Sequence, residues 1–255
     1  DAGSGSSPAS FDLDELDTAR DYTYKVFDAT MDTLKRVRDT LDPDAIEVAV
    51  DALANAEEPG GPTEEWMLKT AGALDCAITG SIAVRVGDGV YNRMLFATPD
   101  GMSHYDKRHL FRMAGEHKRY RPGEQRVIVH WRGWRILLQV CYDLRFPVFS
   151  RCRDDYDLAL YVANWPAKRR QHWRQLLPAR AIENLACVIG VNRIGSDANG
   201  LDYSGDSLAV AADGELLADL QGGPGVAAVA LDGEALGRYR EAFPCHLDAD
   251  AFSID

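Results

Sequence analysis

The spacing of hydrophobic residues changes along the chain. In residues 15–40 apolar side chains recur every three or four positions, which predicts a helix with one buried face. A break at Pro59-Gly60-Gly61-Pro62 precedes a second predicted helix that begins at Thr63. After residue 75, short apolar runs alternate with turn residues, as is typical of strands. The two kinds of pattern together indicate a protein with both helices and sheets.

The second part of the chain contains several hairpin signals. Turns are predicted at Gly87-Asp88-Gly89, at Arg132-Gly133 and, with the strongest signal, at Asp213-Gly214. A helix is predicted over residues 171–185, which are rich in Arg, Leu and Ala. Strands are predicted over residues 76–86, 91–98, 127–130, 134–141, 157–163, 187–192, 207–211, 215–219 and 226–231. These elements indicate a layered α/β sandwich with a mixed sheet.

Composition narrows the classes of protein that fit. With 46% hydrophobic residues among 255, the chain can bury a core, and it shows no repeat or long linker. We therefore expect a single domain over residues 15–255, preceded by a Gly/Ser-rich flexible leader or expression remnant at residues 1–14. The net charge of −12 argues against a general nucleic-acid binder, and no apolar run is long enough for a membrane span.

Cysteine usage bears on compartment and chemistry. Five widely spaced cysteines without a CxxC pair argue against a disulfide framework or a zinc site and favour a reducing cytoplasm. Cys141 stands between an apolar strand and Pro147, which favours the start of a helix. Backbone N–H groups at such a junction lower a thiol pKa and hold an oxyanion. Cys141 is thus a candidate nucleophile, and the alternative is a buried structural cysteine.

Two further segments carry candidate chemistry. Lys107, one of only six lysines, lies in Tyr105-Asp106-Lys107-Arg108-His109, and Glu116 follows nine residues later. Surface exposure is the default expectation for both side chains. The segment 164–170 (NWPAKRR) leaves a predicted buried strand and ends in three cations, which fits a ligand loop or an exposed helix start.

Together these segments resemble the nitrilase superfamily of carbon–nitrogen hydrolases, in its ω-amidase-like branch. The resemblance rests on YDKRHLFRMAGEHKRY (105–120), WRGWRILLQVCYDLRFPVFSR (131–151), DYDLALYVANWPA (155–167), RAIENLACVIGVNRIGSD (180–197), YSGDSL (203–208) and REAFP (240–244). It covers residues from about 60 to the C-terminus. It implies an αββα sandwich with mixed sheets, a homodimer, no cofactor, and a Cys–Glu–Lys triad. Matched by motif, Cys141 is the nucleophile, Lys107 the triad lysine and Glu116 a second glutamate.

The triad acid does not match the family pattern. The family places this glutamate at the end of an early apolar strand, in a Leu-Pro-Glu context. Spacing brings the expected position to residues 41–44 (LDPD), where no glutamate stands. Asp44, one methylene shorter, and Glu47, three residues later, are the candidates. A diverged active site, a catalytically impaired pseudoenzyme or dimeric scaffold, and an unreliable N-terminal sequence all remain open.

The resemblance implies a small linear amide as substrate, most specifically the ω-amide of a 2-oxo acid such as 2-oxoglutaramate. Another amidase or carbamoyl-amide hydrolase of the superfamily is the alternative. The Tyr142 N–H is the expected second oxyanion donor beside Lys107. Binding the substrate carboxylate requires a cation, and the candidates are Arg145 and one of Arg169 and Arg170. Trp165 is expected to form an apolar wall beside it. Arg145 could instead pair with Asp143 or Glu183 as a structural ion pair.

Overall fold

The computed structural model describes residues 56–197 and 200–253, which belong to one compact unit, Asp51–Asp255. The predicted leader at 1–14, the predicted helix at 15–40 and the candidate acids Asp44 and Glu47 lie outside the described residues. The domain boundaries expected from the sequence therefore remain predictions.

The first two layers are a helix and a three-stranded sheet. Helix α3 (Pro62–Leu74) covers one face of an antiparallel sheet of β1 (Ile78–Val86), β2 (Gly89–Thr98) and β3 (Gly101–Asp106). Side chains alternate between the faces of β2, as strand geometry requires. Leu95 packs with Met67 of α3, whereas Met94 and Phe96 belong to the core on the other side of the sheet.

The other two layers are a six-stranded mixed sheet and a second helix. The strand order is β11-β10-β7-β6-β5-β4, with β5, β6 and β7 parallel and the other pairs antiparallel. Leu138 of β5 packs with Met94 and Phe96, and Leu137 packs on the opposite face with Trp173 of helix α5. The strands are β4 (Ile128–Trp131), β5 (Trp134–Val140), β6 (Leu158–Ala163), β7 (Cys187–Asn192), β10 (Leu208–Val210) and β11 (Leu216–Asp219), and α5 spans Arg170–Asn184.

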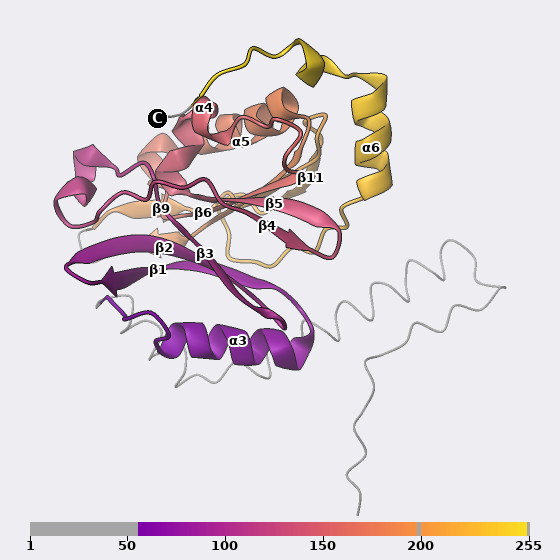
Figure 1. The fold of residues 1–255 in the computed structure, drawn as a ribbon. Coiled ribbons are helices and arrows are strands. Elements are labelled where there is room, and N and C mark those ends of the chain that lie inside the picture. Colours follow the sequence, from indigo (N-terminus) through magenta and orange to yellow (C-terminus); the bar gives the residue numbers. More distant parts are fainter. Residues whose placement is uncertain (1–55, 198–199, 254–255) are drawn as a thin grey trace, which may run out of the picture. The chain divides into compact units, whose positions relative to one another are not determined.

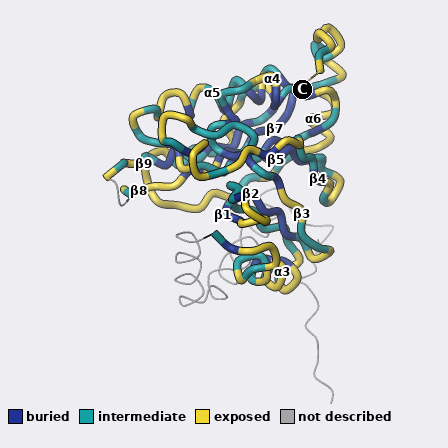
Figure 2. The backbone as a smooth tube through the Cα atoms, turned by 60° about the vertical axis from the view of Figure 1, so that its left-hand side comes forward, coloured by how far each residue is buried: buried dark blue, intermediate teal, exposed yellow. Residues whose placement is uncertain are grey.

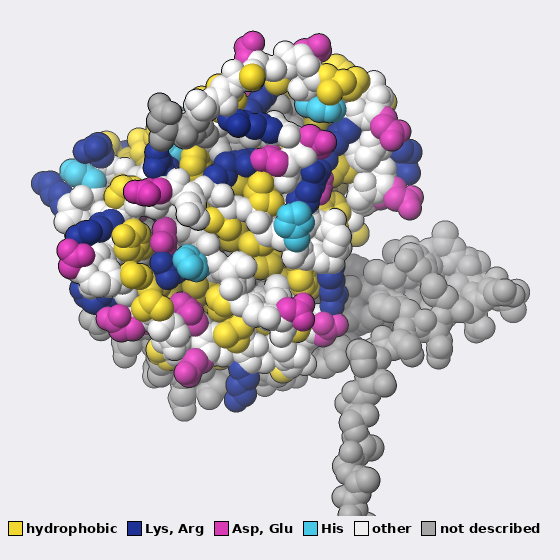
Figure 3. Space-filling model, viewed as in Figure 1, with side chains coloured by type: hydrophobic (Ala, Val, Ile, Leu, Met, Phe, Trp, Pro, Cys, Tyr) yellow, Lys and Arg dark blue, Asp and Glu magenta, His cyan; other side chains and the backbone are white. Residues whose placement is uncertain are grey.

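Figure 1 shows these layers in the order α3, three-stranded sheet, six-stranded sheet, α5. Buried residues concentrate in the strands of the two sheets (Figure 2). Acidic and basic side chains are interspersed on the face seen in Figure 3. The αββα sandwich is confirmed. Among the described residues no helix is both long and apolar enough to cross a bilayer.

Several boundaries differ from the sequence predictions. Residues 226–231 are not a strand, because this stretch is largely exposed and has no sheet partner among the described residues. Helix α6 (Gly233–Ala242), strand β3 and the short hairpin of β8 (Ile194–Ser196) with β9 (Asp202–Ser204) were not predicted. The helix expected to begin at Pro147 is present as α4, but it is only four residues long, Pro147–Ser150.

Candidate active site

Cys141 stands at the carboxyl end of β5, where the chain turns sharply. Its φ of +49° lies in the left-handed region, which is uncommon for a residue with a side chain and is concentrated at functional sites. A 3₁₀ turn, Cys141–Arg145, begins there. The first N–H groups of such a turn have no acceptor within the helix, so the Tyr142 N–H suits an oxyanion.

The Cys141 thiol is held in its protonated form by its surroundings. Burial raises the pKa of this thiol, the nearby Lys107 ammonium opposes the rise, and the Glu116 carboxylate adds to it. The Asn164 carbonyl oxygen lies 3.8 Å from the sulfur. Because burial dominates, a base has to remove the thiol proton before Cys141 can attack.

Lys107 follows directly after β3, and its side chain is buried, with only 3% of the residue exposed. The ammonium donates to both carboxylate oxygens of Glu116, at 2.9 and 2.7 Å. Glu116 is 8% exposed and also accepts from the Phe111 N–H at 2.6 Å and from Asn92 Nδ2 at 3.3 Å. Default surface exposure is therefore wrong for both residues. Glu116 fixes the position of Lys107, whose charge acts on the Cys141 thiol.

The predicted substrate-binding residues gather around the same turn. Trp165, buried at the end of β6, lies under the Arg145 guanidinium at 4.9 Å. Arg169 lies over the Phe111 ring at 5.2 Å, and Phe111 in turn packs against Tyr142 with ring centroids 4.9 Å apart. Both guanidinium groups thus stack on aromatic rings beside the nucleophile's segment.

The ion-pair alternatives for Arg145 are not seen. Arg145 Nη2 lies 2.7 Å from His172 Nδ1. Glu183 pairs with Arg180 at 2.9 Å, and Asp143 pairs with His109 at 2.8 Å. Arg145 therefore remains a candidate for an anion.

Arg170, the other candidate in this loop for binding the substrate carboxylate, forms an ion pair with Asp206 instead. It donates to both oxygens of Asp206, at 2.7 and 2.8 Å. Arg174 also donates to the fully buried Asp206, at 2.9 Å. These ion pairs compensate the negative charge of Asp206 and fasten α5 to the segment before β10. Arg170 therefore has a structural role.

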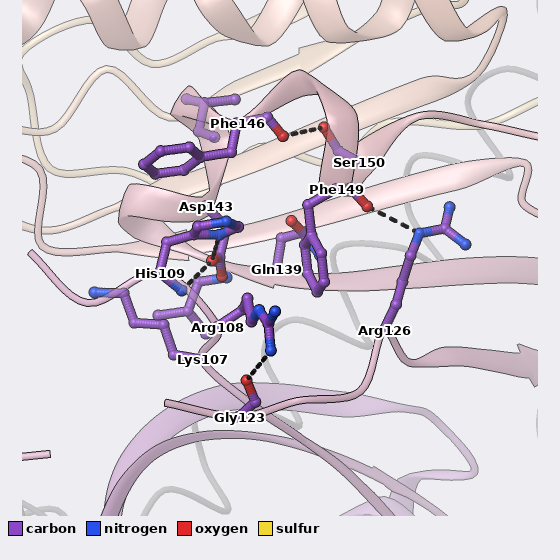
Figure 4. Close-up of polar contacts among 12 residues, drawn as sticks. Lys107, Arg108, His109, Gly123, Arg126, Gln139, Asp143, Phe146, Phe149 and Ser150 are labelled. Atoms are coloured by element: carbon purple, nitrogen blue, oxygen red, sulfur yellow. Dashed lines mark hydrogen bonds and ion pairs between the residues drawn. The ribbon is translucent and has the colours of Figure 1, made fainter. Parts of the chain in front are cut away.

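Sequence reasoning missed a buried polar group directly behind the nucleophile. Asp143 is fully buried, and its carboxylate accepts hydrogen bonds from Val140, Tyr105 and His109. Figure 4 shows His109 reaching Asp143 across the gap between the Lys107 segment and the turn after β5. The signal in the sequence was an aspartate two residues after the candidate nucleophile, at a strand end.

Comparison with known proteins identifies relatives over most of the chain. Residues 46–241 match the family model for carbon-nitrogen hydrolase. The chain is 53% identical over 207 residues to omega-amidase YafV of Yersinia enterocolitica, covering 78% of this chain and 80% of that protein. It is 33% identical over 194 residues to 2-oxoglutaramate amidase of Bacillus subtilis, covering 74% of each.

A solved structure supports the same relationship. XC1258 from Xanthomonas campestris, a CN-hydrolase superfamily protein with an arsenic adduct in its active site, superposes with a TM-score of 0.78 at 47% sequence identity. The match covers 80% of this chain and 81% of that one. Fold and sequence likeness therefore extend over the segments that hold Cys141, Lys107 and Glu116.

Proposed function

The chain belongs to the carbon–nitrogen hydrolase family, in its ω-amidase-like branch, and on that premise we propose that it hydrolyses the ω-amide of a 2-oxo acid, such as 2-oxoglutaramate, to the carboxylate and ammonia. The enzyme class, a hydrolase of non-peptide amides, follows from the family. The particular substrate is supported by the relatives' activities and by the cations around Cys141.

One observation carries the proposal: a buried lysine, fixed by a glutamate, acts electrostatically on a cysteine at a strained strand end. An amide is a poor electrophile, so its carbon needs a thiolate and its oxygen needs charge stabilisation. The Lys107 ammonium stabilises both the thiolate and the developing oxyanion. The burial of Lys107 makes its charge more effective than it would be in water.

The reaction proceeds through a thioester. The Cys141 thiolate attacks the amide carbon and forms a C–S bond, and the oxyanion faces Lys107 and the Tyr142 N–H. Collapse of this intermediate breaks the C–N bond, and the amide nitrogen leaves as ammonia with the proton taken from the thiol. Water then attacks the thioester and breaks the C–S bond. One proton of this water goes to the sulfur, the other is lost when the acid ionises, and the carboxylate leaves.

We propose that the proton carrier in these steps is a carboxylate other than Glu116. Both oxygens of Glu116 accept from the Lys107 ammonium, so Glu116 serves to hold Lys107. Asp44 and Glu47 remain the candidates for the carrier. Comparing Asp44→Asn with Glu47→Gln distinguishes them, because loss of the general base lowers kcat by about 10²–10⁴-fold.

The reaction itself is tested by ammonia release from 2-oxoglutaramate. Wild-type protein should release ammonia, and Cys141→Ala should not. Cys152→Ala is the matched control, because Cys152 is a free, buried thiol that follows α4 and has no part in the proposed reaction. Iodoacetamide should label Cys141 once and inactivate. Full activity in Cys141→Ala would exclude the thioester route, and no activity in wild type would favour a pseudoenzyme.

We propose Arg169 as the main partner of the substrate carboxylate, with Arg145 beside it. An anion approaching a chain of net charge −12 needs local cations, and a guanidinium can bind a carboxylate with two parallel hydrogen bonds. Arg169→Ala should raise KM for 2-oxoglutaramate and leave KM for the neutral propionamide nearly unchanged. Lys168→Ala, an exposed cation in the same loop, is the control. Equal losses on both amides would assign Arg169 to the fold.

We further propose a cytoplasmic homodimer that binds only its small-molecule substrate. The five cysteines are all free, which suits a reducing compartment. The dimer is implied by the family resemblance. Light scattering coupled to gel filtration tests it, and a monomer mass at micromolar concentration would reject it.

A further inference from the structure

Asp143 joins the two segments on which the reaction depends. One oxygen, Oδ2, accepts from the backbone N–H of Val140 at 2.9 Å and from the Tyr105 hydroxyl at 2.8 Å. The other oxygen, Oδ1, accepts from the backbone N–H of His109 at 3.0 Å and lies 2.8 Å from His109 Nδ1. Val140 directly precedes Cys141, and Tyr105 and His109 flank Lys107.

The contacts around this carboxylate leave little room for movement. Asp143 has no exposed surface, and the Tyr105 hydroxyl that donates to it also accepts from the Arg108 N–H at 3.0 Å. The His109 ring stacks on Phe146 with centroids 3.9 Å apart and meets Phe149 edge-on at 5.2 Å (Figure 4). A buried carboxylate with four donors is costly to disturb, because any lost partner leaves a buried polar group unsatisfied.

From this geometry we infer that Asp143 and His109 are positioning residues, which hold the strained Cys141 turn and the Lys107 segment in one fixed arrangement. Neither residue needs to touch the substrate. Their effect is to keep the sulfur and the ammonium at the separation that the reaction requires, since a displacement of about 1 Å can lower a rate 10²-fold. The inference rests on the proposed amide hydrolysis for its kinetic consequences.

Asp143→Asn is the sharpest test, because it preserves shape and removes only the charge and one acceptor. Each oxygen of Asp143 accepts from one backbone N–H, which can only donate, so the amide NH₂ of asparagine faces a donor in either orientation. The turn or the Lys107 segment must then shift. We expect kcat for 2-oxoglutaramate to fall by about 10²-fold with a much smaller change in KM.

A second readout needs no substrate: the pH dependence of Cys141 alkylation by iodoacetamide. Burial raises the pKa of Cys141, Lys107 opposes this, and the charge of Asp143 adds a small further rise. If Asp143 acted only as a charge, Asp143→Asn would lower the alkylation midpoint. If it positions Lys107, the midpoint should rise, because the ammonium moves away. Asp155→Asn, which removes a carboxylate paired with Arg126, should leave the midpoint unchanged.

Two His109 variants keep the inference testable if Asp143→Asn fails to fold. Asparagine carries an amide nitrogen on Cγ, where histidine carries Nδ1, so His109→Asn can still donate to Asp143. We expect His109→Asn to retain kcat within about threefold of wild type, and His109→Ala to lose about tenfold or more.

The outcomes separate this inference from the proposed function. A lowered or unchanged midpoint in folded Asp143→Asn overturns the positioning role, as does wild-type behaviour of His109→Ala or equal loss in both His109 variants. If wild-type protein releases no ammonia from 2-oxoglutaramate, the proposed substrate fails, and the alkylation midpoints still decide whether Asp143 positions Lys107.

Discussion

In the proposed mechanism, the pair of Lys107 and Glu116 links catalysis to stability at the level of single residues. Lys107→Ala removes the charge that faces the oxyanion, so kcat should fall by about 10²–10³-fold. It also leaves the Glu116 carboxylate buried without its cation, which should lower the free energy of unfolding by about 3 kcal/mol. Steady-state kinetics and urea unfolding measure the two effects.

A double variant separates these effects. Lys107→Ala combined with Glu116→Gln removes the uncompensated charge, so stability should largely return while kcat stays low. Lys69→Ala on α3, an exposed lysine, should change neither quantity. Recovery of kcat in the double variant would show that Lys107 acts only by supporting the fold.

The place of a single residue in the fold could be predicted from sequence where its local setting was decisive. The position of Cys141 at a strand end was predictable because an apolar run ends there and Pro147 follows. The buried state of Lys107 and Glu116 was not, because both residue types are usually exposed and their pairing depends on how β3 meets the following turns. Asp143 was considered only as a possible partner of Arg145. Its true partner, His109, is 34 residues away in sequence.

At the level of elements, the packing of α5 on β7 depends on a residue without a side chain. A Cβ at Gly190 would lie 2.5 Å from Cδ1 of Leu177 and 2.8 Å from Cζ2 of Trp173. Both neighbours are fully buried and cannot move into solvent. Gly190→Ala should therefore lower the free energy of unfolding by about 1–3 kcal/mol, measured by thermal or urea unfolding.

The same substitution elsewhere provides the control. Gly72 lies in the exposed part of α3, and a Cβ there meets no atom within 4 Å. Gly72→Ala should stabilise the protein by about 0.5–1 kcal/mol, because alanine has the higher helix propensity. A stabilised Gly190→Ala would mean that α5 can shift away from β7 without loss.

The helices and strands that the sequence predicted correctly are those with the clearest pattern of hydrophobic residues. The strands at β5, β6 and β7 and the hairpin at Asp213-Gly214 were predicted because their apolar runs are buried and their turns carry a specific signal. Helix α6 buries only Leu236 and is otherwise largely exposed, so it has few of the buried apolar positions on which the other elements were predicted. Residues 226–231 are apolar without being paired, which shows that composition alone does not make a strand.

On the scale of the whole molecule, a half-buried network of hydrogen bonds and ion pairs fastens the C-terminal segment to the six-stranded sheet. Arg240 of α6 donates to Asp157 at 2.7 Å and to the carbonyl oxygens of Leu185 and Tyr156, both at 2.8 Å. Asp157, directly before β6, also accepts from the Arg135 guanidinium of β5 at 2.9 and 2.7 Å and from the Arg135 N–H at 3.2 Å. The Asp157 carboxylate thus joins three segments of the chain: β5, the start of β6 and α6.

The titration of that carboxylate predicts how the stability of the whole molecule depends on pH. Burial alone would raise the pKa of Asp157, but hydrogen bonds from Arg135 and Arg240 outweigh it and lower the pKa to about 2. In the unfolded chain an aspartate titrates at about pH 3.9. Folding therefore favours the charged form of Asp157. Its contribution to the free energy of unfolding is complete above the pKa of the unfolded chain and is lost as the pH falls toward 2.

Asp157→Asn should remove this contribution, on the order of 2 kcal/mol of unfolding free energy at neutral pH. The difference in stability between wild type and variant should be constant above about pH 5 and shrink steadily as the pH falls toward 2, because wild-type Asp157 itself becomes protonated there. Urea unfolding across this range measures it. Asp88→Asn, at an exposed ion pair with Arg121, should show little difference at any pH. A difference for Asp157→Asn that persists unchanged at the acidic limit would show that the loss comes from altered packing, with the charge of Asp157 contributing nothing to holding α6 on the sheet.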